Sequence, residues 1–176
     1  MDLDKLVFVD ESGAKTNMTR LYGRAIAGQR AIDDTTSGHW CTTTMISSVR
    51  LDGSTACMVV DGATNKDVFE VYIAKILLPT LKAGDIVILD NLSAHKSRHA
   101  RQLIQSVGAE LWYLPAYSPD LNPIEKMWSK IKSILRTLKA RTKDALIHAI
   151  AEAIEMVTAS DAKGWFELCG YVNTIN

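Results

Sequence analysis

The sequence predicts an α/β fold, in which helices cover both faces of a mixed β-sheet. Strand-like segments come first, strands and helices alternate in the middle, and helical segments end the chain. Residues 85–90 place four consecutive aliphatic residues between two aspartates, which is typical of a strand buried on both faces. With 176 residues, 47% hydrophobic and 23% charged, the chain is expected to form one domain with an ordinary core, and neither a disordered nor a fibrous protein.

Each element is predicted from its hydrophobic period and its flanking residues. Strands are expected at residues 5–10, 41–49, 55–61, 85–90 and 109–114. A further short strand is expected near Arg24–Ile32, within the otherwise loop-forming residues 11–39, and Asp52-Gly53 predicts a hairpin turn. Apolar residues at helical spacing predict helices at residues 66–81, 96–107, 123–138, 143–157 and 159–168.

Several classes of protein are excluded by composition and motifs. No apolar run approaches the roughly 20 residues of a membrane span, and the acidic N-terminus lacks the features of a signal peptide, so we expect a cytoplasmic protein without a membrane partner. Cys41, Cys57 and Cys169 are widely spaced and are expected to be buried apolar residues without disulfide or zinc. The segment from Gly23 to Gly28 lacks the ending of a phosphate-binding loop, so no nucleotide cofactor is expected.

The net charge is zero, but the charges are unevenly distributed. Residues 126–143 hold seven basic side chains and no acidic one. These are Lys126, Lys130, Lys132, Arg136, Lys139, Arg141 and Lys143. Such a block can be a solvated face, or it can bind a polyanion when it lies beside an active site.

Three carboxylates are the candidate catalytic residues. Asp10 ends the first predicted strand, Asp90 ends the central one, and Glu125 lies near the start of a helix. In sheets of this kind, functional groups collect beyond the carboxyl ends of strands. Converging carboxylates repel one another unless a cation is present, and Mg²⁺ suits oxygen ligands and phosphates. Two such ions can activate an attacking oxygen and stabilise a leaving one, which suits phosphodiester cleavage.

Each carboxylate also has a structural interpretation. Asp10 can cap a turn, and Asp90 can form a turn with Asn91. For Glu125 this interpretation is strongest, because Asn122 is a good N-cap and Glu125 would then be placed to close a capping box. Only the three residues together favour a catalytic site.

Three segments resemble the catalytic domain of DDE-type transposases, in the bacterial insertion-sequence branch allied to the mariner superfamily. They are Phe8-Val9-Asp10-Glu11-Ser12, Val87-Ile88-Leu89-Asp90-Asn91-Leu92-Ser93-Ala94-His95-Lys96 and Leu114-Pro115-Ala116-Tyr117-Ser118-Pro119-Asp120-Leu121-Asn122-Pro123-Ile124-Glu125-Lys126-Met127-Trp128. Between Asp90 and Glu125 lie 34 residues (91–124), the interval typical of that branch.

The resemblance implies a fold, a chemistry and partners. The fold would be ribonuclease-H-like, with Asp10, Asp90 and Glu125 as a catalytic triad that binds two Mg²⁺ ions, or Mn²⁺ in their place. The reaction would be nicking of double-stranded DNA at element ends, followed by attack of the freed 3′-hydroxyl on target DNA. A dimer in the DNA complex and a bacterial, nucleoid-associated location are further implications.

Relatives also carry an N-terminal helix-turn-helix region that recognises the element ends. This chain starts shortly before its first predicted strand, so residues 1–176 are expected to form the catalytic domain alone. We expect a separate or upstream-encoded region to supply end recognition.

Four residues near the triad are predicted to bind DNA. Lys132 and Arg136 recur on the helix face of Glu125 and are expected to follow the DNA backbone, although they can also be plain surface cations. His95 and the neighbouring Lys96 lie just beyond Asp90, where His95 could contact a phosphate or orient the site. Glu11 is expected outside the metal shell, because strand alternation would turn it to the opposite face.

Two other functions remain open from sequence. One is a ribonuclease-H-like nuclease that acts on RNA–DNA hybrids or junctions, although the long proline-rich loop before Glu125 favours a transposase. The other is a catalytically silent remnant of a split or decayed transposase, which would serve only in DNA binding or assembly.

Overall fold

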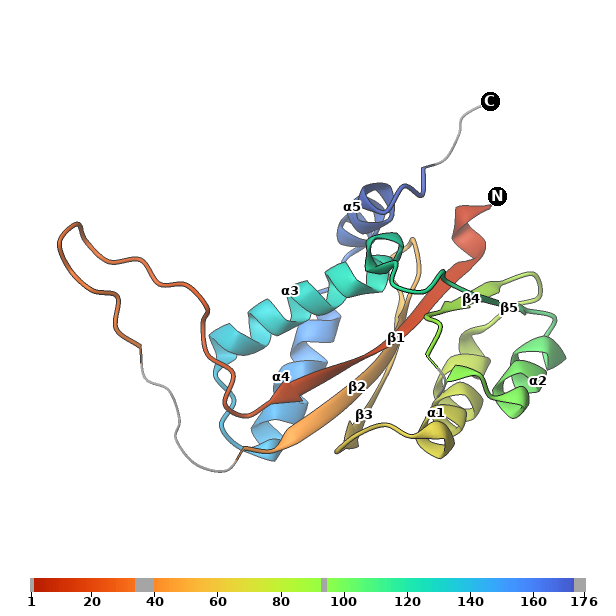
Figure 1. The fold of residues 1–176 in the computed structure, drawn as a ribbon, viewed down its shortest axis with the longest axis horizontal. Coiled ribbons are helices and arrows are strands. Elements are labelled where there is room, and N and C mark those ends of the chain that lie inside the picture. The colour runs from red at the N-terminus through yellow and green to blue at the C-terminus, as the bar shows by residue number, and fades with distance from the viewer. Residues whose placement is uncertain (1, 34–39, 93–94, 173–176) are drawn as a thin grey trace.

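A mixed sheet forms the centre of the fold in the computed structural model, which describes residues 2–33, 40–92 and 95–172. Its strand order is β3-β2-β1-β4-β5 (Figure 1). The first three strands pair antiparallel, whereas β4 and β5 run parallel to β1. The strands are β1 (Leu6–Lys15), β2 (Thr42–Val49), β3 (Thr55–Asp61), β4 (Ile86–Leu89) and β5 (Glu110–Tyr113).

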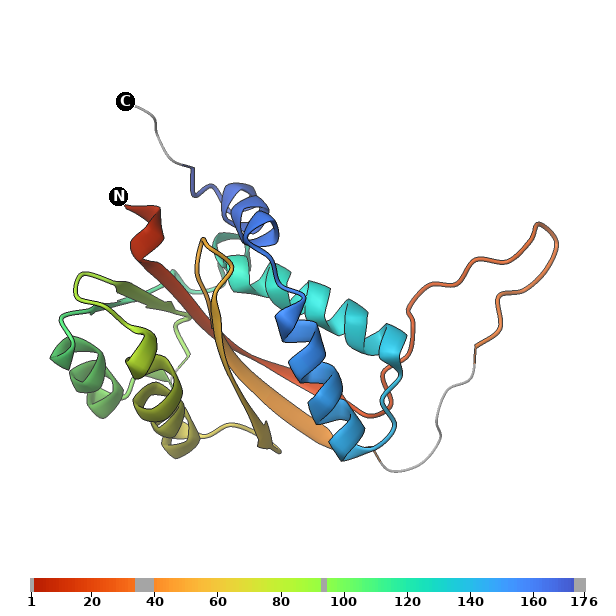
Figure 2. The ribbon, with the colours of Figure 1, turned by 180° about the vertical axis from the view of Figure 1, so that it is seen from behind.

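Helices cover both faces of this sheet, as predicted (Figures 1 and 2). One face carries α1 (Lys66–Tyr72) and α2 (Arg98–Ser106). The other carries α3 (Pro123–Leu138), α4 (Lys143–Glu155) and α5 (Ala159–Leu168). The predicted helix at 66–81 changes its winding, because a π-helical turn (Ile73–Leu77) and a 3₁₀ turn (Leu78–Thr80) follow α1.

The first half of β1 is buried on both faces. Its alternating side chains divide between two cores, since Leu6 and Phe8 pack under α3, α4 and α5, whereas Val7 and Val9 pack under α1 and α2. All four are at most 1% exposed. Burial of such side chains stabilises the fold by about 1.5–3 kcal/mol each, so β1 is anchored firmly up to the point where Asp10 follows.

Two sequence predictions about residues 11–39 are wrong. β1 does not stop at Asp10 but runs to Lys15, because β2 continues beside it and pairs Lys15 with Thr42. The strand expected near Arg24–Ile32 is absent from the described residues 20–33, which lie exposed and unpaired with any strand. Backbone pairing thus extends β1 where its side chains are polar, and the lack of a neighbouring strand leaves residues 20–33 irregular.

The three cysteines are free, as predicted, but they are not all buried. Cys169 lies in the core, whereas Cys41 is exposed, contrary to the expectation. Cys41 precedes the first residue of β2 and so lies outside the core. Among the described helices, none has the length and apolar character needed to cross a membrane.

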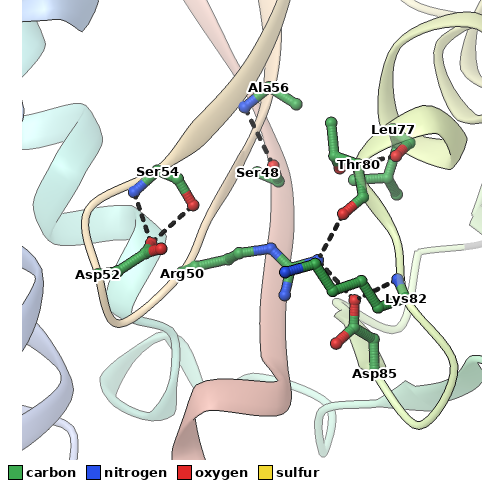
Figure 3. Close-up of polar contacts among 9 residues, drawn as sticks. All are labelled: Ser48, Arg50, Asp52, Ser54, Ala56, Leu77, Thr80, Lys82 and Asp85. Carbon is green, nitrogen blue, oxygen red and sulfur yellow. Dashed lines mark hydrogen bonds and ion pairs between the residues drawn. The ribbon is translucent and has the colours of Figure 1, made fainter.

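An ion pair fixes the end of the sheet at which β1 and β4 begin. Arg50 directly follows β2, and its Nη2 donates to Oδ2 of Asp85 at 2.6 Å and to the carbonyl of Thr80 at 3.1 Å (Figure 3). The same Oδ2 accepts the backbone N–H of Lys82 at 2.8 Å. Burial alone would raise the pKa of Asp85, but the bonds from Arg50 and Lys82 lower it below its usual value. The side chains are only 14% and 5% exposed, so this pair joins β2 to β4 within the protein.

Replacing Arg50 by methionine is expected to destabilise the protein by about 3–5 kcal/mol, because Asp85 would stay buried without its cation. A carboxyl with a depressed folded pKa contributes stability above its ordinary pKa of about 3.9 and loses it as pH falls through the folded value. The difference between wild type and Arg50→Met should therefore shrink on acidification. Urea unfolding at neutral pH and near pH 3.5 measures it.

The matched control is Lys66→Met, which removes the exposed ion pair of Lys66 with Glu70 at 3.9 Å. Such pairs contribute less than about 0.5 kcal/mol. An equal effect of the two substitutions would show that the buried pair is not a special constraint.

Candidate active site

The register of the parallel strands places two of the predicted carboxylates side by side. β1 and β4 pair Leu6 with Ile86 and Phe8 with Ile88. Two residues beyond Phe8 and Ile88, the same register brings Asp10 next to Asp90. Asp10 therefore lies within β1 just where β4 has ended, on the face that points toward α3.

The third carboxylate comes from the start of α3. Glu125 is the third residue of this helix, and its side chain is exposed, whereas Ile124, Met127 and Trp128 are buried in the core. Glu125, Asp10 and Asp90 line one cleft of about 340 Å³. The other walls come from the loop after β4 and the proline-rich segment before α3, namely Asn91, Leu92, Leu114, Pro115, Ala116, Tyr117, Ser118, Pro119 and Asn122.

The capping interpretation of Glu125 is not realised. Asn122 is the N-cap of α3, but its side chain makes no capping bond. A capping box also needs the Asn122 N–H for the Glu125 carboxylate, and that N–H instead donates to the Pro119 carbonyl at 3.2 Å. The Glu125 side chain is thus available to the cleft. The sequence indicated Asn122 only as a cap, yet its Oδ1 is buried without a hydrogen-bond partner among the described residues and its side chain lines the cleft.

His95 is a buried bridge between two carboxylates. Its side chain is only 1% exposed, its Nδ1 bonds to Oδ1 of Asp90, and its Nε2 lies 3.3 Å from Oε1 of Glu11. The imidazole ring also packs on Phe69, with ring centroids 4.5 Å apart. Of the two roles expected for His95, burial favours orientation of the site over contact with a phosphate. Ser93 and Ala94 of the same motif lie outside the described residues.

Glu11 takes the position that strand alternation predicts. β1 continues past Asp10, so Glu11 points to the face of α1 and α2, where His95 packs on Phe69. Its carboxylate thus faces His95 while that of Asp10 faces the cleft. Strand alternation in the sequence predicts the face to which Glu11 points. It does not predict His95 as the partner, because the two residues are 84 positions apart in the chain.

The two aspartates of the cleft have opposite pKa shifts. Burial is the main cause that raises the pKa of Asp10 to about 7, with further contributions from the charges of Glu125 and Asp90 and an opposing hydrogen bond from the Glu11 backbone. Burial also acts to raise the pKa of Asp90, but the hydrogen bond and charge of His95 outweigh it and lower this pKa. Near neutral pH, Asp90 is thus ionised, whereas the Asp10 carboxyl is protonated in part of the molecules.

The donor atoms of the cleft suit a hard divalent cation. All three carboxylates offer oxygen ligands, and a cation would relieve the repulsion from Glu125 and Asp90, which adds to the effect of burial in raising the pKa of Asp10. The Asn122 Oδ1 adds a buried oxygen without a partner among the described residues. Within the described residues, however, no three His, Cys, Asp or Glu side chains come close enough to form a metal site. The chemistry of the donors fits Mg²⁺ or Mn²⁺, while their arrangement is wider than a closed coordination shell.

The basic block on α3 and after it is largely used within the protein. Four of its seven cations have partners, and the pairs are Lys130 with Asp161, Lys139 with Asp33, Lys143 with Asp61, and Arg141 with the carbonyls of Thr16 and Met18. Lys132 and Arg136, the two residues predicted to follow DNA, have no ion pair among the described side chains and are partly exposed on α3. Only part of the block is therefore available to a polyanion.

Two further residues lie at the edges of this region. Lys96 is exposed directly after His95 and outside the cleft lining. Tyr117 lines the cleft and is fully exposed at 101%, with a φ of 60° that is rare for a residue with a side chain. Its exposure argues against a role in core packing, and the proline-rich segment before α3 places it in the lining of the cleft.

Comparison with known proteins agrees, over most of the chain, with the resemblance to DDE-type transposases found in the sequence. Residues 5–147 match the family model of the DDE superfamily endonucleases. The Tc1 transposase of Caenorhabditis elegans is 28% identical over 102 residues, which are 58% of this chain and 37% of that protein. The Tcb2 transposase of Caenorhabditis briggsae is 27% identical over 85 residues, which are 46% of this chain and 31% of that protein.

Solved structures of the Mos1 transposase share the fold. Its strand transfer complex superposes with a TM-score of 0.72 at 18% identity, covering 96% of this chain and 52% of that one. Its catalytic domain with raltegravir and Mg superposes with a TM-score of 0.66 at 14% identity, covering 97% and 81%. These likenesses confirm the ribonuclease-H-like fold. The chain spans about a third of the two curated relatives and about half of the Mos1 chain in the DNA complex.

The buried bridge predicts the titration of His95 in the metal-free protein. Burial acts to lower the pKa of His95, but the bonds to Asp90 and Glu11 raise it to about 9. The imidazole should therefore stay protonated well above its ordinary pKa of about 6.5. NMR titration of the histidine side chains measures this value directly.

Glu11→Gln removes one of the two anionic partners and should lower the pKa of His95 toward its ordinary range. Glu152→Gln, an exposed change on α4, is the control and should leave it unchanged. A His95 that titrates near its ordinary pKa of about 6.5 in the wild-type protein would contradict the bridge.

Proposed function

Because the chain belongs to the DDE superfamily of endonucleases, we propose that it is the catalytic domain of a transposase that cuts DNA at element ends and joins the freed 3′-ends to target DNA. One observation carries this proposal. Asp10 within β1, Asp90 directly after the parallel strand β4 and the glutamate at the start of α3 line the same cleft. Each of these three carboxylates lies in one of the three segments that resemble DDE-type transposases.

In the proposed reaction, Asp10, Asp90 and Glu125 hold divalent cations. Such ions, Mg²⁺ or Mn²⁺ and two in number, would supply Lewis-acid stabilisation of the attacking and leaving oxygens of the phosphodiester. Mos1 transposase structures with Mn and with Mg support this choice for a chain of the same fold. The protein's own contribution is orientation, because His95 fixes Asp90 and the paired strand β1 fixes Asp10.

The DNA partner and the assembly are inferred from the same relatives. Mos1 structures include a paired-end complex with the left transposon end and a strand transfer complex. We infer that this domain likewise works on double-stranded DNA, as a dimer, with a helix-turn-helix region from outside these residues to recognise the element ends. The proposed setting is a bacterial insertion sequence, with the protein in the cytoplasm on the nucleoid.

Cleavage should depend on the three carboxylates. We expect the purified chain to nick plasmid DNA with Mg²⁺ or Mn²⁺, and Asp10→Asn, Asp90→Asn and Glu125→Gln each to lower the rate at least a hundredfold, or about 2.7 kcal/mol of transition-state stabilisation. Glu152→Gln, with an equal change of charge on exposed α4, should retain the activity. The measurement is conversion of supercoiled to nicked plasmid over time.

Nicking that survives in Asp90→Asn would refute this catalytic centre. If the chain, joined to a helix-turn-helix region and supplied with inverted-repeat ends, binds DNA but does not cut it, the silent DNA-binding remnant is the better assignment. Faster cleavage of an RNA–DNA hybrid than of duplex DNA would favour the ribonuclease-H-like nuclease.

Lys132 and Arg136 of α3, which make no ion pair among the described side chains, should contribute to DNA affinity without sequence preference. Lys132→Gln and Arg136→Gln together are expected to weaken binding several-fold at low salt, to a similar degree on unrelated duplexes, because phosphate contacts carry no sequence information. Lys130→Gln is the control on the same helix, since its ammonium bonds to Asp161 at 2.5 Å and to the carbonyl of Met156 at 2.8 Å. It should lower the melting temperature and leave the affinity nearly unchanged, and the reverse pattern in a gel-shift assay would contradict this assignment.

A further inference from the structure

A cationic hollow lies at the start of α2, outside the catalytic cleft. It has a volume of about 360 Å³ and is lined by Lys96, Ser97, Arg98, Arg101 and Tyr113. Three of these five residues are basic and none is acidic. Its lining therefore carries a local charge of +3 in a protein whose net charge is zero.

Among the described residues, no acidic side chain forms an ion pair with the cations of this hollow. Within the described residues, Lys96 and Arg98 make no ion pair, and both are exposed. The guanidinium of Arg101 lies 5.7 Å from the ring centroid of Tyr113, which holds it at the wall without cancelling its charge. The basic block after Glu125 differs, because more than half of its cations have partners.

An acidic side chain close to this region has other partners. Glu70 of α1 accepts a hydrogen bond from the hydroxyl of Ser97 and lies 3.9 Å from the ammonium of Lys66. It does not line the hollow. Ser97 is also the N-cap of α2 and accepts from the Ala100 N–H at 3.2 Å, so this corner is rigidly built.

The hollow is joined to the catalytic cleft through adjacent residues. Lys96 directly follows His95, which bonds to Asp90. Tyr113 lines the hollow and donates its hydroxyl to the His95 carbonyl at 3.2 Å, whereas the next residue, Leu114, lines the cleft. The two concavities are thus lined by adjacent residues at the end of β5, and His95 bonds to one lining residue of each, Tyr113 and Asp90.

We infer that this hollow binds a backbone phosphate of the DNA at a position away from the bond that is cut. The two guanidinium groups of Arg98 and Arg101 and the ammonium of Lys96 suit a phosphate. Arginine offers two N–H donors that can bind two phosphate oxygens at once, and lysine adds a positive charge on a flexible side chain. The N-terminal end of α2 adds the partial positive charge of a helix N-terminus. The inference rests on the proposed function, since it assumes that DNA occupies the cleft. The hollow would give the DNA a second binding point, on the face of the sheet opposite α3.

The test is binding of a fluorescein-labelled duplex without divalent metal, followed by anisotropy over a range of salt concentrations. Arg98→Gln/Arg101→Gln should weaken binding about tenfold at low salt, and the slope of log K against log salt should become shallower by about 0.9 for each phosphate that the protein no longer neutralises. Lys5→Gln/Lys163→Gln is the matched control, because it removes two exposed charges elsewhere, before β1 and on α5. It should leave the slope unchanged.

The outcomes separate this inference from the proposed function. A shallower slope in Arg98→Gln/Arg101→Gln alone, with an unchanged melting temperature, supports the hollow even if the chain never cuts DNA. Equal reductions of affinity in both double variants, or an unchanged slope in the α2 variant, overturn it even if Asp90→Asn abolishes cleavage. Arg98→Lys/Arg101→Lys keeps the charge and should restore the slope, and failure to restore it also counts against the inference.

Discussion

The parallel pairing of β1 with β4 is the constraint on which the candidate site depends. The two strands meet only over the residues from Leu6 to Phe8, and both carry aliphatic or aromatic side chains that pack into a core on each face. A shift of register by one residue would turn each strand's core side chains to the wrong face. The hydrophobic pattern therefore fixes the register, and the register places Asp10 beside Asp90.

Beyond β4, the pairing of β1 with β2 keeps Asp10 in a strand. Asp10 pairs with Ser47, so its backbone is held although no apolar neighbour follows it in sequence. Continuation of the strand also separates the two adjacent acids, because Asp10 faces the cleft and Glu11 faces His95. One strand thus supplies one carboxylate to the cleft and a second one to His95. His95 connects them, since its two nitrogens face Asp90 and Glu11.

Much of the fold was predictable because its elements have clear local signals. β3, α3 and α5 have the predicted bounds, since turn residues and caps mark their ends. The misplaced strand near Arg24–Ile32 shows the limit of such signals, because a strand also needs a neighbour with which to pair. The grouping of Asp10, Asp90 and Glu125 around one cleft agrees with the sequence prediction. Their role as metal ligands remains a proposal, because ligand distances depend on side-chain positions that no spacing in the sequence encodes.

The same limit applies to charge. The sequence shows seven cations after Glu125 as one block, but four of them meet partners that lie far away along the chain, such as Asp33 and Asp61. The shorter group at the start of α2 contains fewer cations, yet none of them has an ion pair in the part of the chain that the structure describes, and they lie beside the segment that carries His95. The field at a surface depends on charge that remains uncompensated after folding, so the smaller group can contribute as much to DNA binding as the larger one. A neutral net charge is then compatible with a nucleic-acid partner, because Lys132 and Arg136 on α3 and the cations at the start of α2 have no ion pair among the described residues.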